Sequence, residues 1–287
     1  MRMQRSEIVH ADCLEYMRGM DDGVVDLVFA DPPFNIGYEY DFYRDNKDHD
    51  EYCQWSSDWI QESFRILKSN GTMWIASGDA FAAEILLIAK KQGFIQRDWI
   101  IWHFTFGPNQ KKKFTPSKTH LFYLVKDANQ FTFNFDAVAI PSARQLKFKD
   151  KRANGAGKVP DNVWLGVEHD GFLLCPEEAY PSATMEGDVW LASRVAGTVH
   201  ERLGWHPCQM PTKVLERILL STSNPGEFVF DPFSGSATTV AVAKAWGREA
   251  VATEISEDYA RKGQERVDAI VFGERLAEGT PILKSSY

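Results

Sequence analysis

The chain has 287 residues, of which 44% are hydrophobic and 25% charged, and its formal net charge is −8 at pH 7. This length and apolar content suffice for one α/β core with an inserted subdomain. No apolar stretch approaches the roughly 18 residues of a membrane helix, and the amino-terminal segment lacks the apolar centre of a secretory signal. We therefore expect a cytoplasmic protein without a membrane segment.

The cysteine and histidine side chains favour neither disulfides nor a metal centre. The four cysteines are scattered and contain no C-x-x-C pair, which is typical of free thiols in a reducing compartment. His103, His120 and His206 lie far apart, without the spacing of metal ligands. We expect no metal site.

Two short strands are predicted near the start of the chain, and the second ends in an unusual turn. Apolar residues predict strands at 8–10 and 24–30, with a short helix at 13–20 between them. The sequence Asp31-Pro32-Pro33-Phe34 follows the second strand directly. Because open α/β folds bind ligands at the carboxyl ends of their strands, this turn is a candidate site.

The turn at 31–34 has the chemistry needed to hold a planar amino group. The Asp31 carboxylate can accept one N–H, and the carbonyl of Pro32 or Pro33 can accept another, which together localise the nitrogen lone pair. Phe34 can stack on the ring that carries the amine. Consecutive prolines restrict the backbone and aim these acceptors in advance. A plain Asp-Pro turn remains the alternative interpretation.

Residues 35–50 are aromatic and acidic without a clear period, so we expect either a mobile loop over the site or a plain surface loop. Beyond it the periodicity predicts helices at 51–67 and 80–92, and strands at 72–76, 94–104, 121–125 and 131–135. The last two bracket the polar residues 126–130 and are predicted to pair as antiparallel strands.

The middle of the chain is basic although the whole chain is acidic. Residues 101–160 hold eleven lysines and arginines against three acidic residues, a net charge of +8 that leaves −16 on the remainder. A basic zone on an acidic body is expected where phosphates bind, and a pair of solvated charged loops is the alternative. The predicted DNA contacts are Lys111, Lys112, Lys113, Arg144, Gln145, Lys149 and Arg152.

The regular pattern breaks between residues 137 and 198, which prolines and glycines punctuate. This segment contains arginine, glutamine and asparagine side chains of the kind that read base edges in the major groove. Residues 141–145, including Arg144 and Gln145, are the first candidates for DNA contact, with a structural loop as the alternative.

In the carboxyl-terminal third, predicted strands and helices alternate again. One of these strands ends in a second polar turn. The pattern predicts helices at 211–221, 237–246 and 256–270, and strands at 228–230 and 250–253. The turn after residue 230 contains Gly235, which lets the backbone approach a ligand closely, and it leads into a helix whose first N–H groups are unpaired.

Glu254 lies 19 residues beyond Gly235, at the tip of the next predicted strand. A carboxylate in that position can accept hydrogen bonds from both ribose hydroxyls of a nucleotide-like cofactor. Structural turns can show the same spacing, so this signal is weak alone. Together with the amine-binding turn at 31–34, however, it favours methyl transfer from a sulfonium donor to an amine.

The order of these motifs resembles the β class of S-adenosylmethionine-dependent DNA amino-methyltransferases, the N6-adenine and N4-cytosine family. In that class the Asp-Pro-Pro-aromatic motif comes first, a target-recognition segment follows and the cofactor motif comes late. The likeness covers most of the chain. Further marks are the sequences at 10–14, 206–211 and 253–255.

The resemblance implies an α/β fold with a doubly wound, mostly parallel Rossmann-like sheet and a circularly permuted motif order. Residues 1–136 and 199–287 would form the catalytic and cofactor-binding domain, with 137–198 as the inserted target-recognition segment. The implied catalytic residues are Asp31, Pro32, Pro33 and Phe34. The implied residues for the cofactor, S-adenosylmethionine, are Asp12, Cys13, Asp31, Pro211, Lys213, Asp231, Phe233, Gly235, Ser236, Thr238, Thr239 and Glu254.

Two positions depart from the family pattern. Ala237 stands where the cofactor turn usually has glycine, and Met210 stands where lysine is usual. Alanine is the mildest replacement for glycine, so cofactor binding should survive unless this residue needs a positive φ angle.

The resemblance implies a DNA adenine-N6 methyltransferase, because aspartate at the first motif position favours adenine, and cytosine N4 is the alternative. The target amine is buried in a duplex, so its nucleotide must be flipped out. Methylation of a protein glutamine amide and a DNA-binding regulator without catalysis are further alternatives. Double-stranded DNA is the expected partner, and a cognate restriction endonuclease and a second copy of the chain are candidates.

Overall fold

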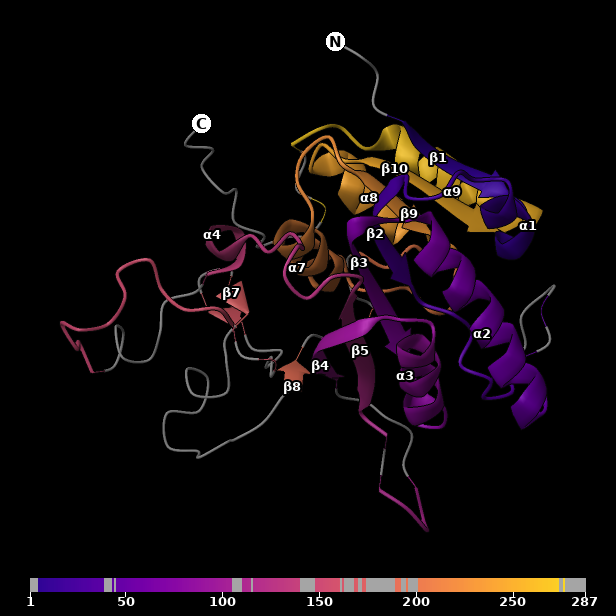
Figure 1. The fold of residues 1–287 in the computed structure, drawn as a ribbon, viewed down its shortest axis with the longest axis horizontal. Coiled ribbons are helices and arrows are strands. Elements are labelled where there is room, and N and C mark those ends of the chain that lie inside the picture. Colours follow the sequence, from indigo (N-terminus) through magenta and orange to yellow (C-terminus); the bar gives the residue numbers. More distant parts are fainter. Residues whose placement is uncertain are drawn as a thin grey trace.

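The structure is a computed structural model with a central sheet between two layers of helices (Figure 1). It describes residues 5–38, 43, 45–104, 110–114, 116–139, 148–160, 162, 168–169, 172–173, 189–191, 195, 201–273 and 276. Within these ranges, no helix is both long and apolar enough to cross a membrane.

The central sheet contains eight of the described strands. In spatial order they are β1 (Ser6–His10), β10 (Glu249–Glu254), β9 (Phe228–Asp231), β2 (Val25–Ala30), β3 (Leu67–Ser77), β5 (Lys118–Val125), β4 (Ile95–His103) and β8 (Val189–Leu191). Only β5 runs antiparallel to its neighbours among these eight strands. The predicted mostly parallel α/β sheet is confirmed.

Helices cover both faces of this sheet, as the alternation of strands and helices predicts. One apolar core joins a sheet face to α1 (Cys13–Arg18), α2 (His49–Ile66) and α3 (Ala82–Lys91). The other core joins the opposite face to α7 (Thr212–Thr222), α8 (Thr238–Ala245) and α9 (Glu257–Ala269). Strands buried between the two layers read as nearly continuous apolar runs for this reason.

Strands β2 and β9 lie side by side at the centre of the sheet, although about 200 residues separate them in the chain. Leu27 pairs with Val229 and Val28 with Phe230 in parallel register. From β2 the chain continues to β3 on one side, and from β9 it continues to β10 on the other. This divergence opens a crevice at their carboxyl ends, which is where open α/β sheets bind ligands.

The predicted antiparallel pairing of 121–125 with 131–135 is wrong. β5 pairs instead with β3 and β4, and the chain from Phe135 to Val138 forms the short helix α4. Phe131 and Phe133 do not extend the sheet. The centroids of both rings lie 6.5 Å from the centroid of Tyr123 on β5, so the two rings pack against the face of the sheet. The alternating apolar residues at 131–135 therefore reflect a segment that packs on a sheet and is not one of its strands.

Side-chain caps explain where α2 begins and how it ends. Asp48 accepts a hydrogen bond from the Glu51 N–H at 2.8 Å and starts the helix two residues before the predicted position. At the other end, Lys126 Nζ donates to the carbonyls of Phe64 and Leu67 at 2.8 and 2.7 Å. Lys126 belongs to the basic zone of the sequence, but here it stabilises the helix terminus.

The described part of the loop at 35–50 is held by one buried carboxylate. Asp45 is 3% exposed and accepts hydrogen bonds from the N–H groups of Asn35, Ile36 and Tyr38 at 2.8 to 3.1 Å. Asn35 also exchanges hydrogen bonds with the backbone of Lys47. The loop therefore folds back on itself beside the turn at 31–34.

The segment at 137–198 contributes to the main sheet as well as to a small hairpin. β8 is paired in parallel with the edge strand β4, and β6 (Glu168–His169) pairs with β7 (Phe172–Leu173). The division of the chain at residues 137 and 198 remains an expectation.

Candidate active site

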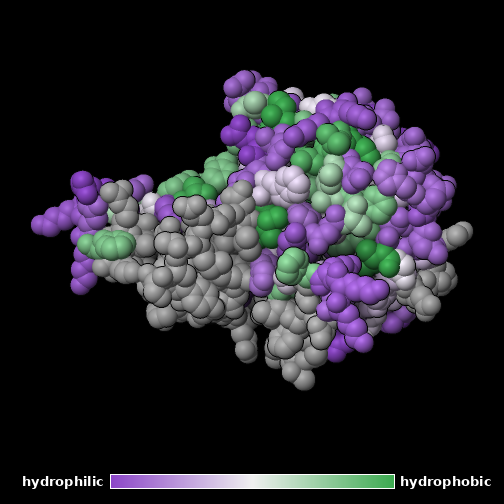
Figure 2. All heavy atoms as spheres, turned by 90° about the horizontal axis from the view of Figure 1, so that it is seen from below, coloured by the Kyte–Doolittle hydropathy of each residue, from purple (hydrophilic) through white to green (hydrophobic). Residues whose placement is uncertain are grey.

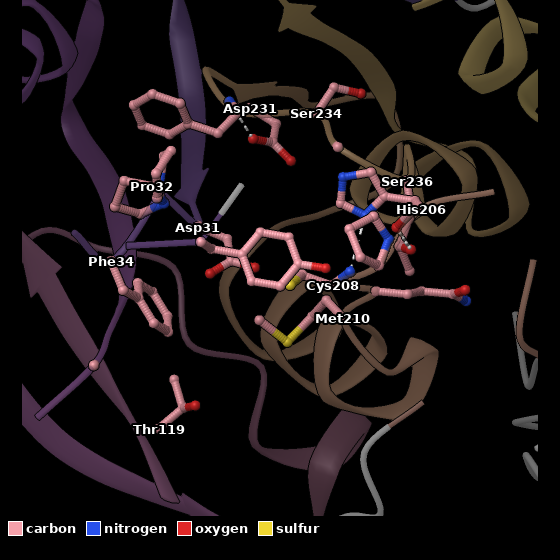
Figure 3. Close-up of a pocket in the computed structure, with 18 of the residues that line it drawn as sticks. Asp31, Pro32, Phe34, Thr119, His206, Cys208, Met210, Asp231, Ser234 and Ser236 are labelled. Atoms are coloured by element: carbon pink, nitrogen blue, oxygen red, sulfur yellow. Dashed lines mark hydrogen bonds between the residues drawn. The ribbon is translucent and has the colours of Figure 1, made fainter. Parts of the chain in front are cut away.

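The two polar turns meet in one cavity at the carboxyl ends of β2 and β9. The cavity has a volume of about 620 Å³, and Asp31 and Asp231 both line it. Figure 3 shows the two aspartates from neighbouring strands facing the same space, with Cys208 and Met210 across from them. Figure 2 shows hydrophobic side chains gathered in a hollow between hydrophilic surfaces.

The two carboxyl groups resist ionisation in the absence of a cation. Burial, and then the charge of Asp231, raises the pKa of Asp31 to about 7. Burial likewise raises the pKa of Asp231 to about 7, although hydrogen bonds from the Thr239 hydroxyl and the Phe233 N–H oppose that shift. Paired acids of this kind favour a bound positive charge or a donor hydrogen.

The backbone of the turn at 31–34 is fixed from two sides. Tyr52 is buried on α2 and donates its hydroxyl hydrogen to the carbonyl of Pro33 at 2.8 Å. The Phe34 ring lies so close to Gly78, at the end of β3, that a Cβ atom there would be 3.0 Å from Phe34 Cδ2. Residue 78 must therefore be small if the ring is to keep its place.

The turn after β9 approaches a histidine that faces the same cavity. Gly235 has a φ angle of +49°, and a Cβ atom on it would lie 3.0 Å from the His206 ring. Burial lowers the pKa of His206 to about 4, so the ring is neutral near pH 7. Its Nδ1 accepts the Cys208 N–H at 3.3 Å, and this assigns the hydrogen to Nε2. Both the positive φ and the close contact require glycine at 235.

Ala237 adopts the left-handed conformation, with a φ angle of +59°. This is the condition under which alanine is a costly substitute for glycine, by about 1–2 kcal/mol. Its methyl group packs against α9 at Gly263, where a Cβ atom would come within 3.1 Å of the Ala237 Cβ. On the next turn of α9, Arg266 Nη1 donates to the Ser236 carbonyl at 2.6 Å. The turn is therefore held against α9.

Glu254 ends β10 beside this turn. Its Oε2 accepts the Gly235 N–H at 2.9 Å, and its Oε1 accepts the Ser256 N–H at 3.0 Å. Burial raises the pKa of this carboxyl, and the backbone N–H groups partly offset that effect. The carboxylate is thus fixed in orientation while it still lines the cavity.

Aromatic side chains form the wall between Glu254 and α2. The Phe233 ring lies edge-on to Trp59, with centroids 5.3 Å apart, and 5.6 Å from Trp55. Cys13 lines the cavity next to Asp12, whose Oδ1 caps α1 by accepting the N–H groups of Leu14 and Glu15. This end of the cavity is flat-walled and apolar, as a planar heterocycle requires.

Most of the predicted site residues line this one cavity. They are Asp12, Cys13, Asp31, Pro32, Pro33, Phe34, Asp231, Phe233, Gly235, Ser236, Thr238, Thr239 and Glu254. Pro211 and Lys213 lie outside the lining: Pro211 is the N-cap of α7, and Lys213 is on its first turn. Cys208, Gln209 and Met210 face the cavity instead.

The predicted DNA contacts fall into three groups. Lys113 is at the cavity rim, next to the exposed Lys111 and Lys112. Lys149 is exposed, and Arg152 forms an ion pair with Asp150 at 3.0 Å. The remaining two, Arg144 and Gln145, lie outside the described residues.

Comparison with known proteins identifies the family. A family model described as DNA methylase, of the N6/N4 type, matches residues 25–265. The DNA adenine methyltransferase YhdJ of Escherichia coli strain K12 is 33% identical over 264 residues, which are 91% of this chain and 82% of YhdJ. The chain belongs to this DNA methylase family. The methylase uses S-adenosylmethionine and acts on DNA.

Solved structures of the same fold resemble the methylase at low sequence identity. The M1.HpyAVI–SAM complex has a TM-score of 0.58 at 19% identity, covering 91% of this chain and 98% of that one. The cytosine-N4-specific PvuII DNA methyltransferase has a TM-score of 0.65 at 15% identity, covering 92% and 87%. These likenesses concern the fold of the methylase.

Sequence reasoning missed several residues that shape the cavity of the methylase. Tyr52, Gly78 and Gly263 act on the turns from other elements, and they lie outside the motifs that the sequence analysis found. His206 lies in a sequence that resembles the family pattern, but its contact with Gly235 appears only in three dimensions. At the rim, Asp79 Oδ1 binds His120 Nε2 at 2.8 Å and Lys118 Nζ at 3.2 Å.

Proposed function

We propose that this methylase transfers the methyl group of S-adenosylmethionine to N6 of an adenine flipped out of duplex DNA. The observation that carries the proposal is the shared cavity of the turns at 31–34 and 231–239. One turn offers acceptors for an amino group and the other offers a cofactor cradle. Their neighbouring positions at β2 and β9 bring amine and donor together, which lowers the entropic cost of reaction.

On the amine side, Asp31 accepts one N–H of the base and a proline carbonyl accepts the other. Because the Pro33 carbonyl already accepts the Tyr52 hydroxyl, we assign this role to Pro32. Phe34, held by Gly78, stacks on the base. The acceptors draw both hydrogens toward the protein and localise the nitrogen lone pair, and the ionised Asp31 stabilises the positive charge that develops on nitrogen.

On the cofactor side, the cavity fits the shape and charge of the group. When bound, S-adenosylmethionine supplies an electrophilic methyl group on a positively charged sulfur. Glu254, oriented by two backbone N–H groups, accepts the ribose hydroxyls, and the aromatic wall at Phe233 holds the adenine. Asp231 and the turn at 235–239 hold the amino acid end, where its ammonium group offsets the buried charge.

Adenine is favoured over cytosine by two observations. The first motif residue is Asp31, and the relative YhdJ is named as a DNA adenine methyltransferase. Cytosine N4 presents a similar amine, so the chemistry of Asp31 and Pro32 would serve either base. The fold likeness to a cytosine-N4-specific enzyme does not bear on this choice.

We propose that residues 137–198 form the target-recognition segment and that 1–136 and 199–287 form the catalytic domain. The proposed DNA contacts are Lys111, Lys112, Lys113, Arg144, Gln145, Lys149 and Arg152. Lys113 lines the cavity, and the exposed Lys111 and Lys112 precede it in the chain; in this proposal all three supply phosphate contacts. A cognate restriction endonuclease and a second copy of the chain are the further proposed partners, to be tested by the gene neighbourhood and by the mass in solution.

Radioactive methyl transfer to DNA tests the proposal, followed by sequencing of the methylated bases. We expect label on adenine N6 in wild-type reactions. Asp31→Ala should reduce transfer at least about 100-fold, because it removes a charged acceptor at the reacting amine, while cofactor binding by calorimetry stays near normal. Asp58→Ala, at a half-buried position on α2 outside the cavity lining, is the control. Substantial turnover by Asp31→Ala, or label on cytosine, would contradict the assignment.

A further inference from the structure

One aromatic side chain at the cavity rim has no packing role. Phe114 is 100% exposed, more than any other large hydrophobic residue that the structure describes. It lies in the chain between β4 and β5. An isolated exposed apolar residue is ordinary, so the exposure of Phe114 is informative only together with the charge and position of its neighbours.

Phe114 lies in the chain between two residues that line the cavity. Lys113 and Pro116 both line the cavity, so the chain passes along its rim at these residues. Phe114, between them, is outside the lining and exposed to solvent. Phe114 therefore carries a solvent-exposed ring between two residues that line the cavity.

The charge around Phe114 fits a polyanion. Lys111, Lys112 and Lys113 precede it and are exposed. An apolar ring beside three ammonium groups is poorly suited to a protein interface core, where lysine is depleted. Lysine contacts to phosphates combined with an apolar wedge between base steps are, by contrast, a recurrent way of deforming duplex DNA.

We propose that Phe114 inserts into the base stack of the duplex and fills the gap left by the flipped nucleotide, while the neighbouring lysines bind the flanking phosphates. This inference rests on the proposed function, since only a base-flipping enzyme creates such a gap. Extrusion of a base breaks its pairing and stacking. A ring stacked in its place recovers part of the lost stacking and keeps the base in the cavity.

The test uses a short duplex that carries the methylation site found by sequencing. Phe114→Ala should lower the single-turnover methylation rate on this duplex by about 10- to 100-fold, the range typical of losing one aromatic–base stack. The same variant should act at the wild-type rate on the single strand, where no stack has to be filled. Cofactor binding should not change.

Three controls isolate the role of the ring. Phe114→Trp should keep most of the rate, since it also stacks. Leu87→Ala truncates an apolar side chain that is 58% exposed on α3, outside the cavity lining, and should have no effect. A duplex with an abasic site opposite the target base should restore the rate of Phe114→Ala, because flipping then costs less.

Failure of this inference is distinct from failure of the proposed function. No methylation of adenine by the wild-type protein would reject the function. Normal wild-type activity with an equal rate for Phe114→Ala on the duplex would reject the wedge alone. An equal loss of rate on the duplex and on the single strand would also reject the wedge. So would a wild-type dimer that dissociates in Phe114→Ala while the rate on the duplex is unchanged.

Discussion

At the scale of single residues, the paired carboxyl groups of Asp31 and Asp231 set a pH dependence. Both have pKa values near 7, above the roughly 4 of an unfolded aspartate. Between these values the folded state binds protons that the unfolded state does not. The contribution of this pair to the free energy of unfolding of the ligand-free protein should therefore be greatest below about pH 4. It should decrease as the pH rises toward 7.

Catalysis should change with pH in the opposite direction, because Asp31 must be ionised to accept an N–H and to balance positive charge. We expect the single-turnover rate at saturating cofactor to rise with pH and to level off above about 7. The bound cation lowers the apparent pKa of the pair, so the midpoint should lie at or below this value.

Asp231→Asn provides the comparison for this pH profile. Removing the neighbouring negative charge should move the midpoint of the rate profile to lower pH, and cofactor should be kept saturating because Asp231 is itself a proposed cofactor contact. A rate that does not depend on pH between 5 and 8 in the wild-type protein would mean that Asp31 is not the titrating acceptor.

At the scale of elements, the cofactor turn depends on α9. Ala237 has a left-handed backbone and its methyl group fits only because residue 263 on α9 is glycine. Gly263→Ala should therefore destabilise the protein by about 1–3 kcal/mol through overpacking and weaken cofactor binding. Ala237→Gly should cost little, since glycine adopts this conformation readily.

The double variant distinguishes this contact from a general helix effect. In Gly263→Ala with Ala237→Gly the clash disappears, so stability and cofactor affinity should both recover toward wild type, with a coupling free energy of at least about 1 kcal/mol. Denaturant unfolding and calorimetry measure the two quantities. Additive effects would show that the methyl contact does not hold the turn.

At the scale of the whole molecule, the separation of charge should govern DNA association. The chain carries −8 overall, yet the exposed residues 111–113 are three consecutive lysines, the last of which lines the cavity. Replacing all three with glutamine should reduce the slope of log K against log salt by about 2–3, near 0.9 per lost phosphate contact. Lys90→Gln with Lys91→Gln on α3 should leave the slope unchanged. Equal slopes in the triple variant and wild type would remove these lysines from the interface.

The sequence predicted the site residues because their chemistry is local. Asp31, Gly235 and Glu254 each follow a short apolar run, and parallel strands bring their carboxyl ends to one edge of a sheet. The pairing of β2 with β9, which joins the two turns in one cavity, appears in the structure. The helices and most strands follow from periodicity, which is also local. Periodicity failed at 131–135, since alternating rings bury one face whether or not the chain pairs as a strand.

Tertiary structure decided what holds the site in place. The Tyr52 hydroxyl on Pro33, the contact of His206 with Gly235 and the fit of Ala237 against Gly263 each join segments that are distant in the chain. Such contacts leave no periodic or motif signal, because each depends on where a side chain from another element arrives. The exposure of Phe114 is likewise a result of packing: a phenylalanine in sequence predicts burial, and among the residues that the structure describes this one is fully exposed.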